Sequence, residues 1–158
     1  MDFNKLWANF MDTVQNHYMD FNGRVGLTQY WYFVLAWAVA FVVITIIGEA
    51  IHLWLLMPIV GLAFALPVAA ASARRIQDTG NNGQLALLWL AAFAASMLME
   101  LLGRLGIYIP ILSGLLGELI DAAAALLTLA IIYFAIQRGQ AEANAYGPPP
   151  AVWTPTAV

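Results

Sequence analysis

Charged residues interrupt the chain only at wide intervals, and these intervals indicate its architecture. Three of them lack any charged side chain and are mostly apolar: residues 25–48, 53–73 and 79–99. A helix needs roughly 20 residues to cross a hydrocarbon core about 30 Å thick. The pattern therefore predicts three transmembrane helices, at about residues 28–48, 53–73 and 84–104.

A fourth apolar interval, residues 122–137, is too short to cross the membrane by itself. A full span ending near Gln137 must reach back far enough to take Glu118 and Asp121 into its outer part. The predicted fourth span therefore covers residues 117–137. Asp121 shares a four-residue spacing with a glycine and an alanine, so we expect it to face neighbouring helices and to be partly buried.

The two ends differ from the apolar middle. Large apolar side chains recur at helical spacing near the start of the chain, at Phe3, Leu6, Trp7, Phe10, Val14 and Tyr18. This spacing predicts an amphipathic interfacial helix within residues 1–22, lying flat at the membrane surface. Residues 139–158 are rich in Gly, Ala and Pro, so we expect a flexible, mostly disordered tail. The fold class is an all-α membrane protein whose four-helix domain covers residues 23–138.

Composition agrees with a membrane protein and limits the kinds of functional site that the chain can form. Of the 158 residues, 63% are hydrophobic and 9% charged, where a soluble domain carries about 25% charged residues. The net charge of −3, with six Lys and Arg, provides no basic footprint for nucleic acid. Cysteine is absent, which excludes disulfides, thiolate metal sites and a cysteine nucleophile. The sequence offers no sign of a cofactor or a metal site.

The cations indicate an orientation. Lys and Arg in short flanking loops stay on the cytoplasmic side of the membrane. With four spans, five of the six cations share one side: Lys5, Arg24, Arg74, Arg75 and Arg138. Arg104 lies on the other side. We therefore expect both termini in the cytoplasm, and topology alone could account for Arg74 and Arg75.

The second span carries the features of a packed helix. Small residues recur in it every four positions, at Gly61, Ala65, Ala69 and Ala73. Such stripes of small residues let the backbones of transmembrane helices approach closely, whereas large side chains such as leucine hold them apart. Pro67 interrupts the same span and frees a backbone carbonyl one turn earlier, which a neighbouring group or water must satisfy.

The segment "ARRIQDTGNNGQ" holds the most concentrated polar chemistry of the chain. Asp78 could accept backbone N–H groups in its own loop, and Gly80 and Gly83 allow positive φ angles in a tight connection. Four residues form what we term the arginine cluster: Arg24, Arg74, Arg75 and Asp78. Either these side chains make a cytoplasmic ion-pair network or the segment is a plain solvated turn.

Six ionisable residues fall near the opposite membrane face and form what we term the acidic cluster: Glu49, His52, Glu100, Arg104, Glu118 and Asp121. Glu100 and Arg104 stand four apart on one helix, in the order that favours an ion pair. Carboxylates inside a bilayer are costly and mark functional candidates, unless they reach the interface and are solvated there. We expect Arg104 to pair with Glu118 or Asp121 as well.

Two stretches, "FNGRVGLTQYW" and "PVAAASARRIQDTGNNG", with a weaker "NAYGPPP", resemble the bacterial inner-membrane family known as domain of unknown function eight-zero-five, the YhaH-like proteins. The resemblance covers residues 21–148 and implies a four-helix inner-membrane protein, with no established activity. The matching positions are Phe21, Gly23, Arg24, Tyr30, Trp31, Pro67, Arg74, Arg75, Asp78, Thr79, Gly80, Gly83, Asn144, Tyr146 and Gly147. The chain departs from the family pattern at Leu27, Gln29, Gln77, Asn82 and Gln84.

These observations favour a non-enzymatic membrane component. No nucleophile–base pair, phosphate-binding loop or metal motif stands out, so an enzyme is the weakest hypothesis. A structural or accessory role in a membrane assembly fits best, with the lipid bilayer, a second copy or other integral membrane proteins as partners. The alternative is a small transporter or ion-conducting protein that uses Glu118 and Asp121. Against transport, residues 122–136 offer only Thr128 and Tyr133 as polar side chains, so a proton would find no relay across the span.

Overall fold

The computed structural model describes residues 2–107, 110 and 112–153. The regular elements of this part of the chain are all helical: α1 Phe3–Asn16, α2 Leu27–Ala50, α3 Met57–Asp78, α4 Gln84–Arg104 and α5 Gly117–Ala135. A short irregular turn, Leu112–Leu116, precedes α5. Four of the helices are long and apolar enough to cross a membrane, α2 to α5, the last counted from Gly114. The predicted all-α fold with four spans is confirmed.

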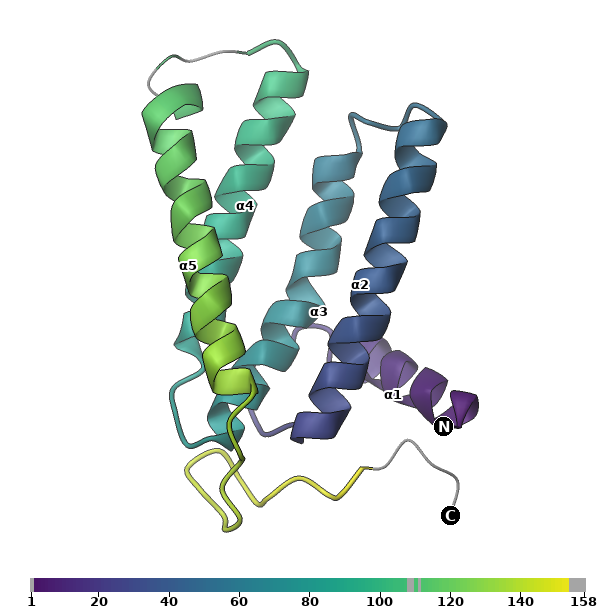
Figure 1. The fold of residues 1–158 in the computed structure, drawn as a ribbon, viewed down its shortest axis with the longest axis vertical. Helices are drawn as coiled ribbons and strands as arrows, with labels where there is room; N and C mark the ends of the chain where they lie inside the picture. Colours follow the sequence, from purple (N-terminus) through teal and green to yellow (C-terminus); the bar gives the residue numbers. More distant parts are fainter. Residues whose placement is uncertain (1, 108–109, 111, 154–158) are drawn as a thin grey trace.

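The four long helices form two antiparallel hairpins, α2–α3 and α4–α5, which meet at one end of the bundle. Figure 1 shows α2 beside α3 and α4 beside α5, with α1 lying across the lower ends of α2 and α3. Helix α3 contacts α2, α4 and α5. Helix α1, the segment that follows α5 and the α3–α4 connection lie at the lower end of the bundle (Figure 1), which we term the arginine end. The α2–α3 connection lies at the opposite end, which we term the acidic end.

Helix α3 is longer than predicted toward the arginine end, and this changes the interpretation of its polar segment. It begins at Met57 and continues to Asp78, so both arginines of "ARRIQDTGNNGQ" lie in its last two turns. The connection itself is limited to residues 79–83. Gly80 has the predicted positive φ, +85°, but Gly83 has an ordinary φ of −70°. The positive φ predicted for Gly83 is wrong: a Cβ there would lie 2.9 Å from the Ala73 carbonyl oxygen, so close packing is what requires a glycine.

The predicted stripe of small residues is the buried face of α3. Gly61, Ala65, Ala69 and Ala73 are all buried, the last three at 4% exposure or less. Because these side chains are short, α4 and α5 can approach the α3 backbone closely. Helix α3 is therefore the central element of the bundle.

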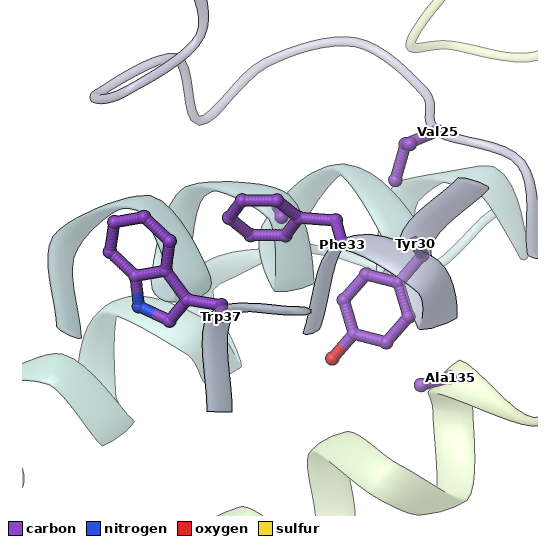
Figure 2. Close-up of a cluster of buried hydrophobic side chains, with 6 residues drawn as sticks. Val25, Tyr30, Phe33, Trp37 and Ala135 are labelled. Carbon is purple, nitrogen blue, oxygen red and sulfur yellow. The ribbon is translucent and has the colours of Figure 1, made fainter. Parts of the chain in front are cut away.

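Helix α1 packs against α2 and α3 through a face that carries both aromatic and polar side chains. Phe10 packs against Phe33 and Trp37, with ring centroids 6.0 and 5.4 Å apart. Figure 2 shows these two α2 rings in a row with Tyr30, near Val25 and Ala135. Two positions on the same side of α1 are buried and polar, Asn9 and Thr13. Asn9 can be buried because its side-chain amide donates to the Gln29 carbonyl at 3.2 Å.

The carbonyl freed by Pro67 is satisfied from the segment that follows α1. The proline sits inside α3 and cannot donate to the Ala63 carbonyl oxygen. The Tyr18 hydroxyl donates to that oxygen instead. At the next residue, the indole Nε1 of Trp37 donates to the Phe64 carbonyl at 2.7 Å. The two bonds join this segment and α2 to the part of α3 that precedes Pro67.

The first part of the predicted flexible tail is attached to the bundle. Residues 144 and 147 exchange backbone hydrogen bonds in a tight turn. The Asn144 amide donates to the Gln77 carbonyl at 3.0 Å, and the Gln140 N–H donates to the Asp78 carbonyl at 2.9 Å. Order therefore extends past the last span as far as this turn, because polar groups of α3 bind it.

Candidate functional site

The arginine cluster is centred on the Asp78 carboxylate at the end of α3. Arg24 Nε donates to Asp78 Oδ1 at 2.8 Å, and Arg75 Nη1 donates to Oδ2. The side chains of Arg24, Arg75 and Asp78 are only 2%, 0% and 4% exposed. Buried charges of this kind require partners, since a desolvated unpaired charge is costly. The plain solvated turn is thus excluded in favour of the ion-pair network.

Backbone carbonyls satisfy the remaining donors of Arg75. Its Nε donates to the Ala135 carbonyl at 3.1 Å, and its Nη2 donates to the Gln137 carbonyl. These carbonyls belong to the C-terminal end of α5, which has unsatisfied oxygens and a partial negative charge. Arg75 Nη1 also reaches the Val25 carbonyl, at 3.4 Å. A single side chain of α3 therefore holds the end of α5 beside the segment that precedes α2.

Arg24 holds the tail in a similar way, by donating hydrogen bonds to its backbone carbonyls. Its Nη1 donates to the Glu142 carbonyl at 2.8 Å and to the Gly147 carbonyl at 3.2 Å, and its Nη2 donates to the Gln140 carbonyl. The family motif around Asn144 and Gly147 thus corresponds to a turn that wraps the Arg24 guanidinium. The sequence matched these two residues to the family pattern but did not reveal this role. A backbone carbonyl accepts a hydrogen bond whatever the residue type, so the sequence does not mark it as an acceptor.

Arg74 does not join its neighbours around Asp78. It is 6% exposed, and its Nε and Nη2 have no hydrogen-bond partner in the structure. Arg74 lines a separate cavity between α1, the connection to α2 and α3. Of the three arginines that could engage Asp78, Arg24 and Arg75 do so and Arg74 does not, because adjacent helical residues point in different directions. Asp78 also engages arginines and not the N–H groups of its own loop, since its carboxylate is turned toward Arg24 and Arg75.

Two acidic residues of α1 and the following segment face Arg74 across this cavity. They are Asp12 and Asp20, with His17 beside both, and sequence reasoning missed all three. Burial opposes ionisation of the Asp20 carboxyl, but hydrogen bonds from His17 and the Asn22 N–H, with the charge of Arg74, lower its pKa overall. The signal that could have found part of this group is the three-residue spacing of His17 and Asp20, which lets their side chains meet in a turn.

The acidic cluster divides into two groups. Arg104 pairs with Glu100 on the same helix, Nη2 to Oε1 at 2.6 Å, as predicted. It also reaches Glu49 on α2, at 3.5 Å, and donates to the Trp54 carbonyl at 2.7 Å. His52 lies exposed in the α2–α3 connection with a φ of +62°. The Arg104 group therefore ties α4 to the α2–α3 connection.

Glu118 and Asp121 lie apart from Arg104. Both line a cavity of about 520 Å³ between α4 and the start of α5, together with Glu100. Asp121 accepts a hydrogen bond from Ser96 Oγ at 2.6 Å. The expected ion pair of Arg104 with these acids is wrong, because Arg104 is already engaged by Glu100 and Glu49. The expected burial of Asp121 is also wrong: its side chain faces the open cavity and is exposed. The connection between α4 and α5 includes Tyr108, Ile109 and Ile111, which lie outside the described residues.

Aromatic and apolar side chains separate the two ends of the bundle. A cavity of about 210 Å³ between α2, α3 and α4 is lined by Trp37, Phe41, Phe64, Trp89 and Phe93, among other apolar residues. The hydrogen bond between Trp89 Nε1 and Thr128 Oγ1, 2.9 Å, is a rare polar contact at this depth. The arrangement offers buried ion pairs at the arginine end, an open cavity lined by carboxylates at the acidic end and an apolar middle.

Comparison with known proteins agrees with this architecture. Residues 18–148 match the family described as Protein of unknown function (DUF805). The chain is 36% identical over 83 residues to Inner membrane protein YhaI of Escherichia coli strain K12, a match that covers 51% of this chain and 70% of the relative. The same figures hold for the protein of that name from Escherichia coli O157:H7. No solved structure matches the chain. With most of its length matched and all four spans in place, this chain belongs to the DUF805 family of proteins of unknown function.

Proposed function

We propose that this multi-pass membrane protein is a non-enzymatic structural or accessory component that associates, within the bilayer, with a second copy or with other integral membrane proteins. One observation carries the proposal: Arg24 and Arg75 are paired with Asp78 at the arginine end, and apolar and aromatic side chains fill the bundle between the two ends. A protein that moves a polar solute needs polar groups along its path. Arg75 and Arg24 instead serve to fasten helices together.

The outward faces of the bundle can accept another helix. Large apolar side chains at three- and four-residue spacing are exposed on α2, at Leu35, Val39, Val42 and Ile46. A similar series is exposed on α5, at Leu119, Leu126, Leu129 and Tyr133. This spacing suits side-chain interdigitation between helices. Lipid can cover the same surfaces, so association needs a direct test.

Site-specific crosslinking in native membranes tests the proposal. The chain has no cysteine, so single variants Val39→Cys and Leu126→Cys report on one face each. We expect at least one of them to form a discrete crosslinked product with a second copy or a stoichiometric partner. Ser72→Cys is the matched control, because Ser72 is 1% exposed and cannot reach another chain. Monomer alone from both variants, in crosslinked membranes and after mild detergent extraction, would contradict the proposal.

We propose further that the arginine end faces the cytoplasm, because five of the six cations lie at or near it. The expected result is that an impermeant thiol reagent labels Leu105→Cys in intact cells but not Gln15→Cys or Asn81→Cys. Leu105 is exposed at the end of α4, and the other two positions are exposed at the arginine end. Permeabilised cells provide the control, in which all three variants should react. Labelling of Asn81→Cys in intact cells would reverse the orientation.

The cavity at the acidic end favours one alternative function. Three carboxylates, Glu100, Glu118 and Asp121, line it, and such a group could take up a cation or a proton. We expect no flux, since apolar and aromatic side chains fill the bundle between this cavity and the arginine end. Cation and proton flux into reconstituted vesicles should equal that of empty vesicles. Flux that disappears in Asp121→Asn, while Ser96→Ala retains it, would establish transport in place of the accessory role.

A further inference from the structure

A polar cavity of about 250 Å³ lies at the arginine end, between α1, residues 17–25 and the last turns of α3. It is distinct from the Arg24–Asp78–Arg75 pairs, although Arg24 forms part of its wall. The ionisable groups that face it are Asp12, His17, Asp20, Arg24 and Arg74. Helix α1 lies across the bundle at this level, beside the ends of two membrane spans (Figure 1). The cavity is therefore at the depth of the lipid headgroups.

Arg74 is the unusual member of this set. Its side chain is more than nine-tenths buried, yet its Nε and Nη2 have no hydrogen-bond partner. No ion pair joins it to Asp12 or Asp20, which interact with it only through space. A guanidinium has five N–H donors and keeps its charge in proteins. Such a group calls for an oxyanion acceptor, which the surrounding side chains do not supply.

The remaining charges of the cavity restrict what that acceptor can be. Asp78 and carbonyls of the tail engage the donors of Arg24, so the charged groups left to bind a ligand are Arg74 and two carboxylates, with His17 bonded to Asp20 at 3.0 Å. A simple anion would suit Arg74 but would be repelled by Asp12 and Asp20. A simple cation would leave Arg74 without an acceptor. A ligand with a negative group and a positive group a few bonds apart satisfies both sides.

We propose that this cavity binds a phosphoethanolamine headgroup, with its phosphate against Arg74 and its primary ammonium between Asp20 and Asp12. Arginine is well suited to phosphate, and an ammonium with three N–H donors can bond to two carboxylates. A quaternary ammonium of similar charge has no donor to give them. The volume of 250 Å³ equals that of roughly eight water molecules in the liquid, comparable with the eight or so heavy atoms of the headgroup. Membrane phosphatidylethanolamine and soluble glycerophosphoethanolamine both carry this chemistry.

The test measures the melting temperature of the purified full-length protein in detergent micelles with added lipid. Phosphatidylethanolamine, phosphatidylcholine and phosphatidylglycerol of identical acyl chains are compared, and glycerophosphoethanolamine is added in a separate arm. We expect phosphatidylethanolamine to raise the melting temperature by on the order of 5 °C more than the other two lipids. Arg74→Gln and Asp20→Asn should each abolish this difference. Arg138→Gln, at an exposed arginine outside the cavity, should retain it.

Each outcome decides the proposal. Equal shifts for all three lipids, or the largest shift for anionic phosphatidylglycerol, would overturn it. So would an unchanged ethanolamine preference in Arg74→Gln. If that variant does not fold, Asp12→Asn replaces it, and its unchanged preference would count in the same way. A matching shift from glycerophosphoethanolamine alone supports the headgroup chemistry and assigns a soluble source; a shift from the lipid alone assigns a bilayer source.

Discussion

Asp78→Asn should destabilise the protein by about 3–5 kcal/mol, more than any single arginine substitution in the cluster. The reason is that the change leaves two buried guanidinium groups, of Arg24 and Arg75, without their shared carboxylate. Arg75→Gln should cost less, because the Arg24–Asp78 pair survives. The double variant should be more stable than the sum of the two single effects predicts, by a coupling of about 1–3 kcal/mol. Equilibrium unfolding in mixed micelles measures all three.

Arg74 supplies the matched control for this cycle. It is adjacent to Arg75 in sequence and is also buried, but it makes no contact with Asp78. The effects of Arg74→Gln and Asp78→Asn should therefore add to within about 0.5 kcal/mol. Equal coupling of Arg74 and Arg75 to Asp78 would show that the carboxylate does not discriminate between them, contrary to the geometry.

The second large effect is expected from Gly139→Ala. A Cβ at this position would lie 2.0 Å from the Asp78 Oδ2 oxygen, which binds Arg75. Either the carboxylate leaves its arginines or the chain after α5 shifts away from it. We expect a loss of stability near that of Asp78→Asn, about 3 kcal/mol. The measurement is again unfolding in mixed micelles.

Two controls separate the clash from the general effect of adding a methyl group. Gly103→Ala adds a Cβ inside α4 where no atom lies within 4 Å, so it should be neutral or slightly stabilising. In an Asp78→Ala background, which removes the opposing carboxylate, Gly139→Ala should cost little. A Gly139→Ala variant as stable as Gly103→Ala would mean that the two segments are not in contact.

Hydropathy alone predicted the four spans because a lipid environment imposes a minimum apolar length on any helix that crosses it. The stripe at Ala65 and Ala69 predicted the packed face of α3 for a similar reason, since small residues have few other uses there. The Glu100–Arg104 pair followed from helical spacing. These features depend on residues close in sequence, whose relative geometry is fixed by the helix itself.

The choice between Arg74 and Arg75 could not be made from the sequence. They stand four and three residues before Asp78, and both spacings allow an ion pair on a helix. The rotation of α3 about its axis decides which of the two arginines pairs with Asp78, and that rotation depends on how α3 packs against α4 and α5. Similarly, nothing in the sequence placed Arg104 nearer Glu49 than Asp121, because the relative tilt of the two hairpins sets those distances.

The contacts of Arg24 also impose an order on the synthesis of the protein. Arg24 precedes the first span, whereas the carbonyls that bind it belong to Gln140, Glu142 and Gly147, more than 115 residues later in the chain. A growing chain exposes Arg24 long before these acceptors leave the ribosome. Until then Arg24, Arg75 and Asp78 can meet only one another, and the end of α5 is not yet in place for Arg75. The arginine end is therefore the last part of the bundle to close, and a nascent chain halted before residue 140 keeps it open to quality-control proteases.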